Sequence, residues 1–147
     1  MTPLEKRHTA TRLTIARYGA HPFKWGGCDC ARIAAFHARK FGWAVPKPGG
    51  YRSAIGAAKR LKELGCVTLM DLIDRTGLPE IAPARAMMGD FVSFAADQPI
   101  GAVGIVVGNG NMMTFHESHL TPVIMSMTTI DRAWSVLPPP EPVQVPD

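Results

Sequence analysis

Cysteine is rare in this 147-residue sequence, and its three positions have the spacing of neither a disulfide nor a zinc site. Cys28 and Cys30 stand too close together for an ordinary bridge, and Cys66 lies in a different segment. A single Cys-x-Cys pair with scattered histidines is weak evidence for a metal site. We therefore expect three reduced thiols, with Cys66 buried as a small apolar residue, and neither a metal nor a cofactor.

Long apolar runs are missing as well. No stretch approaches the roughly 20 residues that a helix needs to cross a bilayer, so no membrane span is expected. The polar segment Met1–His8 lacks the apolar stretch of a signal peptide. These absences predict a protein that is made in the cytoplasm and that, if exported, leaves by another route.

Acidic residues are nearly absent from the first half of the chain. Residues 1–62 hold 13 Lys and Arg but only Glu5 and Asp29 as acids, a net charge of +11, whereas residues 63–147 carry −7. Two interpretations stay open: a basic face that meets an acidic protein, a cell-wall polymer or nucleic acid, or the solvated sides of three helices. Nucleic acid ranks last among these partners, because the sequence has no known binding motif and no aromatic-rich stacking surface.

What the first half does contain is helix signals. Thr2 and Glu5 form a capping box, with Pro3 at the first helical position. On this helix we expect an apolar face that includes Leu4, Ile15 and Tyr18, and a solvent-facing side that includes Arg7, His8 and Arg12. The predicted helices cover residues 3–18, 29–41, 53–64 and 68–74, the last three begun by the capping residues Asp29, Ser53 and Thr68.

The second half changes to the short alternating patterns of strands. Gly108–Gly110 has the composition of a hairpin turn, and residues 78–86, with two prolines, are expected to be a connector. Together the two halves predict an α+β fold, with N-terminal helices packed on a small antiparallel sheet. Residues 1–137 would form one domain, followed by an extended proline-rich tail over residues 138–147. The predicted strands are residues 90–95, 100–107, 112–117, 123–127 and 132–137.

Cys30 is the strongest candidate for chemistry. It falls in the first turn of a predicted helix, where the macrodipole and unpaired N–H groups favour the thiolate, the nucleophilic form. The glycine pair that precedes it, Gly26 and Gly27, lets the backbone present the sulfur to an open surface. Asp29 is interpreted as a helix cap rather than a catalytic acid. Trp25 is a candidate substrate-binding residue, with a packing anchor as the alternative.

Three motifs resemble those of NlpC-type papain-like peptidoglycan endopeptidases. Residues 25–30 resemble their "WGG…DC" nucleophile motif, and residues 89–94 resemble their "GDLVFF" strand. Residues 101–110 resemble "GHVGIYLGNG", the strand that carries the catalytic base in those enzymes. The resemblance implies a papain-like (NlpC-type) fold and a cysteine peptidase-like site with Cys30 as its nucleophile.

The chain is still more similar to a phage and prophage domain family related to those enzymes. That resemblance implies a component of the phage virion at the tail tip, made in the host cytoplasm. Its expected partners are other tail-tip and baseplate hub proteins, with peptidoglycan as a further one. The motifs that carry it are Pro22–Gly26 followed by Asp29 and Cys30, then Gly50–Ser53, Gly89 with Asp90, Gly104 with Ile105 and Gly108, and Ala133 with Trp134.

Two positions depart from the peptidase pattern. Ala102 stands where the peptidases have their base histidine, and Thr114 where a second polar residue orients that base. The departures imply a degenerate, structural protein. The alternative is an active peptidoglycan endopeptidase that aids cell-wall penetration, in which Cys30 works with a relocated base, either His116 or a group from a neighbouring subunit. His116 could equally lie in water at a hairpin tip, so enzymatic activity stays open.

Overall fold

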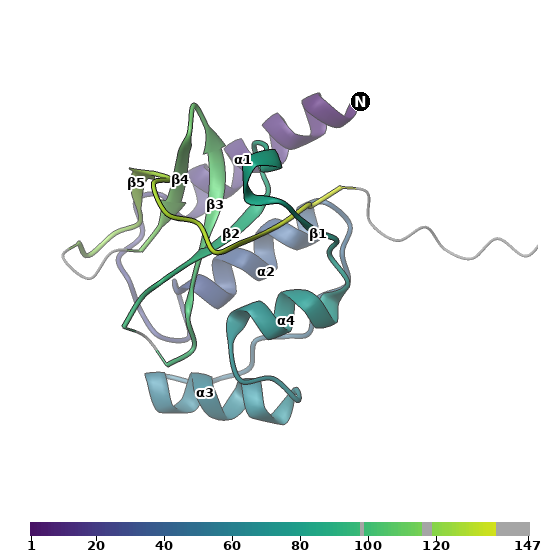
Figure 1. Ribbon diagram of the computed structural model, residues 1–147. Coiled ribbons are helices and arrows are strands. Elements are labelled where there is room, and N and C mark those ends of the chain that lie inside the picture. The colour runs from purple at the N-terminus through teal and green to yellow at the C-terminus, as the bar shows by residue number, and fades with distance from the viewer. Residues whose placement is uncertain (98, 116–118, 138–147) are drawn as a thin grey trace, which may run out of the picture.

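Four helices precede a six-stranded antiparallel sheet in the computed structural model, which describes residues 1–97, 99–115 and 119–137 (Figure 1). No helix within these residues combines the length and apolar character that a membrane span requires. The helices are α1 (Pro3–Tyr18), α2 (Cys30–Lys40), α3 (Ala54–Glu63) and α4 (Leu69–Thr76), with a short 3-10 turn η1 (Pro83–Arg85). The strands are β1 (Glu80–Ile81), β2 (Phe91–Phe94), β3 (Ala102–Gly108), β4 (Asn111–Thr114), β5 (Val123–Ser126) and β6 (Arg132–Trp134).

The sheet has the order β1-β6-β2-β3-β4-β5, so β3 lies inside it between two neighbours. Ile105 of β3 is paired with Phe91 on one side and Met113 on the other. The turn that joins β3 to β4 contains Asn109 at φ 54°, a left-handed conformation that asparagine tolerates better than most residues. The predicted hairpin and the predicted α+β class are both confirmed.

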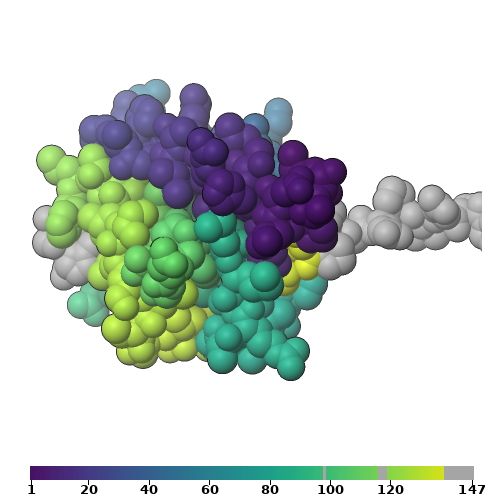
Figure 2. Space-filling model, turned by 90° about the horizontal axis from the view of Figure 1, so that it is seen from above, coloured from purple at the N-terminus to yellow at the C-terminus, as the bar shows by residue number. Residues whose placement is uncertain are grey.

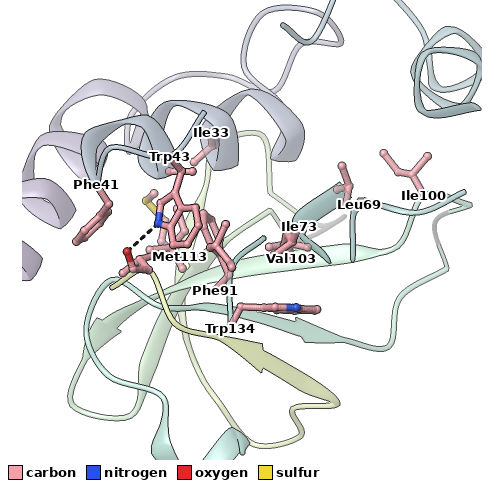
Figure 3. Close-up of a cluster of buried hydrophobic side chains, with 14 of the residues drawn as sticks. Ile33, Phe41, Trp43, Leu69, Ile73, Phe91, Ile100, Val103, Met113 and Trp134 are labelled. Atoms are coloured by element: carbon pink, nitrogen blue, oxygen red, sulfur yellow. Dashed lines mark hydrogen bonds between the residues drawn. The ribbon is translucent and has the colours of Figure 1, made fainter. Parts of the chain in front are cut away.

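Each face of the sheet packs against a different cluster of apolar side chains. Phe91 and Ile105 join the main core with residues of the helices, whereas Val92 and Val106 pack in a smaller cluster on the opposite face. This division follows the two-residue period of the strands. In the main core the Trp43 indole donates a 2.8 Å hydrogen bond to the carbonyl of Val136 (Figure 3). Trp134, also shown there, is fully buried.

The predicted faces of α1 are wrong at Leu4 and Arg7. They are confirmed at Ile15 and Tyr18, which pack against the core, and at His8 and Arg12, which are exposed. Leu4 is 66% exposed, whereas Arg7 is buried with its guanidinium 2.7 Å from the Asp90 carboxylate. Arg7 also donates to the carbonyl of Met88, which ties α1 to the segment that leads into β2. This segment is the teal chain beside the purple helix in Figure 2. The apolar period could not identify this face because its buried residues are Arg7, Ala10, Thr11 and Thr14.

The connector predicted over residues 78–86 contains two elements that the sequence analysis missed, β1 and η1. β1 pairs with β6 and is only two residues long, too short for any alternation to show in the sequence. Arg132 of β6 binds both Glu80 of β1, at 2.7 Å, and Asp74 of α4, at 2.9 Å. A single guanidinium thus joins three elements at this edge of the sheet.

His37 on α2 is fully buried and links α1 to the segment that precedes β2. Its Nε2 lies 2.8 Å from the carbonyl oxygen of Gly89, and its Nδ1 lies 2.6 Å from the Thr14 hydroxyl. A carbonyl can only accept, so Nε2 carries the proton and Nδ1 accepts from Thr14. Burial lowers the pKa of His37 to about 4, which keeps the ring neutral.

The stability of the fold should therefore depend on pH through His37. Between pH 6.5 and 4 the unfolded chain binds a proton that the folded chain does not, so the stabilisation present above pH 6.5 is lost as pH falls. The expected loss is about 3 kcal/mol in the free energy of unfolding, measured by urea denaturation across this range. His37→Gln should flatten the dependence, and His8→Gln, at an exposed position, should not. Equal slopes in all three proteins would contradict this role.

Candidate active site

Cys30 begins α2, directly after the residue that caps the helix. Asp29 is buried, and its Oδ1 accepts a 2.9 Å hydrogen bond from the backbone N–H of Arg32. Its Oδ2 accepts from the backbone N–H of Gly26, also at 2.9 Å, which closes the preceding turn. The interpretation of Asp29 as a cap is therefore confirmed, and both of its carboxylate oxygens are committed to the backbone around Cys30.

A tyrosine completes this support. The Tyr51 hydroxyl donates a 2.8 Å hydrogen bond to Asp29 Oδ2. Burial and the neighbouring Asp29 carboxylate both raise the pKa of Tyr51, so it remains a donor. Gly26 adopts φ 79°, and a side chain there would lie 2.0 Å from the Tyr51 carbonyl oxygen. The role of Tyr51 was not expected from the sequence, although the residue lies in the shared segment Gly50–Ser53.

The thiol of Cys30 is held in its neutral form. Burial, followed by the charge of Asp29, raises the pKa of Cys30 to about 12. Hydrogen bonds from the backbone of Phe115 and Val103 lower it, but by less. This result differs from the expectation of a thiolate, because burial, and after it the Asp29 carboxylate, disfavour the charged form at this helix terminus. Cys30 is partly exposed and lines the cleft, and its raised pKa leaves little thiolate at neutral pH.

Cys30 opens into a cleft of about 420 Å³. One part of its lining is a row of edge-to-face aromatic rings, with Phe23 centred 5.0 Å from Trp25 and 5.1 Å from Phe115. Trp25 thus lines the cleft that holds Cys30, as a substrate-binding residue would, and that role stays a prediction. Phe23 and Phe115 were not expected here. The rest of the lining is Phe94, Ala95, Ala96, Asp97, Ile100, Gly101 and Ala102.

The two positions that depart from the peptidase pattern both lie near Cys30. Ala102 lines the same cleft as Cys30. Thr114 lines an adjoining smaller pocket with Cys30, and its hydroxyl donates a 3.2 Å hydrogen bond to the carbonyl of Val103. His116 lies outside the described residues, so its part in the site stays a prediction. Among the described residues, no imidazole lines the cleft, and Asp97 is the one carboxylate there.

A metal site was not expected from the cysteine spacing. The described residues contain no group of three or more His, Cys, Asp and Glu side chains placed to hold an ion. Cys28 and Cys66 are buried free thiols, and burial raises the pKa of both. Cys30 is the one described cysteine that lines the cleft.

Replacing Asp29 by asparagine should make the Cys30 thiol more acidic. Asparagine can keep the Oδ1 cap on Arg32, but it removes the charge that helps to raise the pKa of Cys30. The measurement is the rate of iodoacetamide alkylation against pH, whose midpoint should shift downward. Asp97→Asn is the matched control, since it removes another carboxylate of the cleft that does not perturb the thiol. An equal shift in both variants would contradict the assignment.

The fold is that of the NlpC/p60 domains. The chain is similar to the NlpC/p60 domain of the peptidoglycan hydrolase SagA, with TM-score 0.55 and 16% identity over 87% of this chain and 97% of that one. It is also similar to an NlpC/P60 family protein from Bacillus cereus, with TM-score 0.56 and 18% identity over 89% of this chain and 40% of that one. It is similar as well to NlpC2 from Trichomonas vaginalis, with TM-score 0.56 and 14% identity over 88% of this chain and 47% of that one. The chain therefore spans less than half of the last two proteins.

Within this fold the chain belongs to the family described as Domain of unknown function (DUF6950), whose model matches residues 2–136. No curated protein matches the chain. The predicted α+β, NlpC-type fold is confirmed by these structural neighbours, and the resemblance to NlpC-type proteins holds at the level of the fold.

Proposed function

We propose that this chain is a phage tail-tip or baseplate component that keeps a papain-like peptidase fold but has little or no hydrolytic activity. The observation that carries the proposal is the state of the Cys30 thiol. Its pKa is raised to about 12, and no imidazole among the described residues lines its cleft. Attack on an amide needs a thiolate and also a proton donor for the leaving amine.

The loss of such an acid–base group lowers the rate of acyl transfer by orders of magnitude. Ala102 has no group that can accept or donate a proton, and the Thr114 hydroxyl is already bonded to the backbone. The cleft itself is retained, with the aromatic row of Phe23, Trp25 and Phe115 along it. A cleft of this kind can hold a cell-wall peptide without cleaving it, and this would give the protein a role in contact with peptidoglycan.

The tail-tip assignment rests on the motifs shared with the phage and prophage family. In that setting the protein would be made in the host cytoplasm and assembled into the virion beside other hub proteins. The proline-rich segment 138–147, which lies outside the described residues, would dock on a neighbour as an extended arm. Mass spectrometry of purified virions from an induced lysogen that encodes the protein tests this assignment. Absence of the protein from tail fractions would exclude the tail-tip assignment.

One observation favours the alternative, an active endopeptidase. Phe115 lines both the cleft and the smaller pocket with Cys30, and the next residue in the chain is His116. A base supplied from this position would sit close to the nucleophile. A base from a neighbouring subunit would serve the same purpose.

Alkylation of Cys30 against pH, together with digestion of purified peptidoglycan, separates the two candidates. The degenerate protein should alkylate slowly at pH 7, release no peptides and respond equally to His116→Ala and His21→Ala. An active enzyme should release peptides, lose this activity in Cys30→Ala, and show a thiol pKa that rises specifically in His116→Ala. That second set of results would overturn the proposal.

A further inference from the structure

Arginine side chains from two helices hold the loop between α2 and α3. The loop, residues 44–52, contains two prolines, Pro46 and Pro48, which have no backbone N–H to donate. Its carbonyl groups are instead bound by guanidinium groups that keep their charge at the surface. Arg32 donates to the carbonyl of Gly49, Arg39 to those of Val45 (3.3 Å) and Pro46 (3.4 Å), and Arg60 to that of Lys47 (2.8 Å).

The positive charge around this loop is largely unbalanced. Among the described ion pairs, only Arg60 with Glu63 involves one of the arginines that hold the loop, at 3.2 Å. The Glu63 side chain is 65% exposed, so the pair is screened by water. Lys47 and Arg52 add two exposed cations on the loop itself. Five of the 13 Lys and Arg of residues 1–62 thus lie on or around this loop and form a cationic rim: Arg32, Arg39, Lys47, Arg52 and Arg60.

An apolar pocket of about 50 Å³ lies beneath the same loop. Val45, Pro46, Pro48 and Tyr51 of the loop line it, together with Arg60. Its deeper walls come from α2, α3, α4 and the sheet, and in the view of Figure 1 α4 lies below α2 and above α3. The space exists because α2 presents only alanines there: Ala31, Ala34, Ala35 and Ala38. It has room for roughly four heavy atoms, the size of one branched aliphatic side chain.

We propose that this loop and pocket dock an acidic segment of a partner protein, which inserts one leucine-like side chain into the pocket. Within the cationic rim, Lys47, Arg39 and Arg60 supply charge complementarity to carboxylates on either side of that leucine-like side chain. The pocket is too small for an acyl chain or a stacked base, and a plain polyanion would make no use of it. The loop does not line the Cys30 cleft, and the two cavities share Ile100 in their linings. Binding at the loop therefore does not require an active Cys30.

Fluorescence anisotropy with short labelled peptides tests the proposal on the full chain. The probes are a Glu/Asp-rich peptide with one central leucine, the same peptide with serine in its place, and a Lys-rich peptide with the leucine. A short single-stranded DNA and phosphatidylglycerol vesicles represent the other anionic partners. We expect the acidic leucine peptide to bind about tenfold more tightly than either variant peptide, the DNA or the vesicles.

Two variants then locate the binding. Leu72→Phe adds volume to a residue that lines the pocket, and Leu13→Phe makes the same change on exposed α1. Arg39→Glu with Lys47→Glu reverses charge on the rim, and Arg12→Glu with Arg17→Glu gives the same net charge on α1. The pocket and rim variants should each lose about tenfold in affinity, and their controls should not. Thermal melts confirm that all four remain folded.

Several results would overturn the proposal. Equal binding of the leucine and serine peptides would mean that charge alone acts and the pocket is unused. An equal loss in both charge-reversal variants would mean that binding is not localised to the loop. Binding of the DNA or the vesicles more tightly than the acidic leucine peptide would assign the cationic rim to a different partner. No binding of any peptide would show that the loop and pocket are not a docking site.

Discussion

Replacing Arg7 by methionine is expected to lower the free energy of unfolding by about 3–5 kcal/mol. Methionine fills a similar volume, so the main effect is to leave the buried Asp90 carboxylate without its counter-charge. Asp90 is 1% exposed, so water cannot solvate its carboxylate in place of Arg7 unless the structure opens. Its remaining partners are neutral, the backbone N–H groups of Met87 and Val136. Urea denaturation at pH 7 measures the loss.

The matched control for Arg7 is Arg12, an exposed arginine on the same helix. Arg12→Met should change the free energy of unfolding by no more than about 0.5 kcal/mol. The double variant Arg7→Met with Asp90→Asn should lose less free energy of unfolding than the sum of the losses in the two single variants. Each single change leaves one buried charge without its partner, and the double change does not. A loss below about 1 kcal/mol for Arg7→Met would show that water reaches Asp90 and that the pair contributes little.

Placing histidine at position 102 is expected to activate the Cys30 thiol. An imidazole there enters the cleft that Cys30 lines, and an imidazolium beside a cysteine lowers its pKa to about 3.5–7.5. From a starting pKa of about 12, the thiolate fraction at pH 7 rises by about 10⁴-fold or more. The thiolate also becomes less nucleophilic as its pKa falls, so alkylation at pH 7 should accelerate by roughly 100-fold or more.

The control for this substitution is Ala44→His, which adds the same group at an exposed position outside the cleft. It should leave both the alkylation rate and its pH midpoint unchanged, and Ala102→His with Cys30→Ser should show no labelling at position 30. An unchanged pH profile in Ala102→His would mean that residue 102 cannot reach the sulfur. In that case Ala102 could not explain a loss of activity.

Local signals in the sequence were enough to predict most of the fold. Helix caps such as Asp29 and Thr68 act over three residues, and the hairpin at Asn109 depends on a single backbone conformation. The class of fold followed from the change of period between the two halves. Arg7 was misplaced because its burial depends on Asp90, 83 residues away, and no local pattern contains that partner.

The candidate site was predictable only in part. The position of Cys30 at a helix start followed from Asp29 and the glycine turn before it. Its protonation state did not, because it depends on how much of the folded protein surrounds the sulfur and on the Asp29 carboxylate beside it. The aromatic row could not be predicted either, because Phe23 and Phe115 come into contact only when the end of β4 packs beside the turn before α2.

The order of the two halves along the chain has a consequence for synthesis. The helical half leaves the ribosome first, but α1 cannot complete its ion pair until Asp90 follows Arg7 by 83 residues. At roughly 5–20 residues per second, about 4–17 seconds pass between them. During that interval the apolar sides of the helices have no sheet to cover them. The net charge of +11 on residues 1–62 makes nascent chains repel one another, which protects them from aggregation until the sheet arrives.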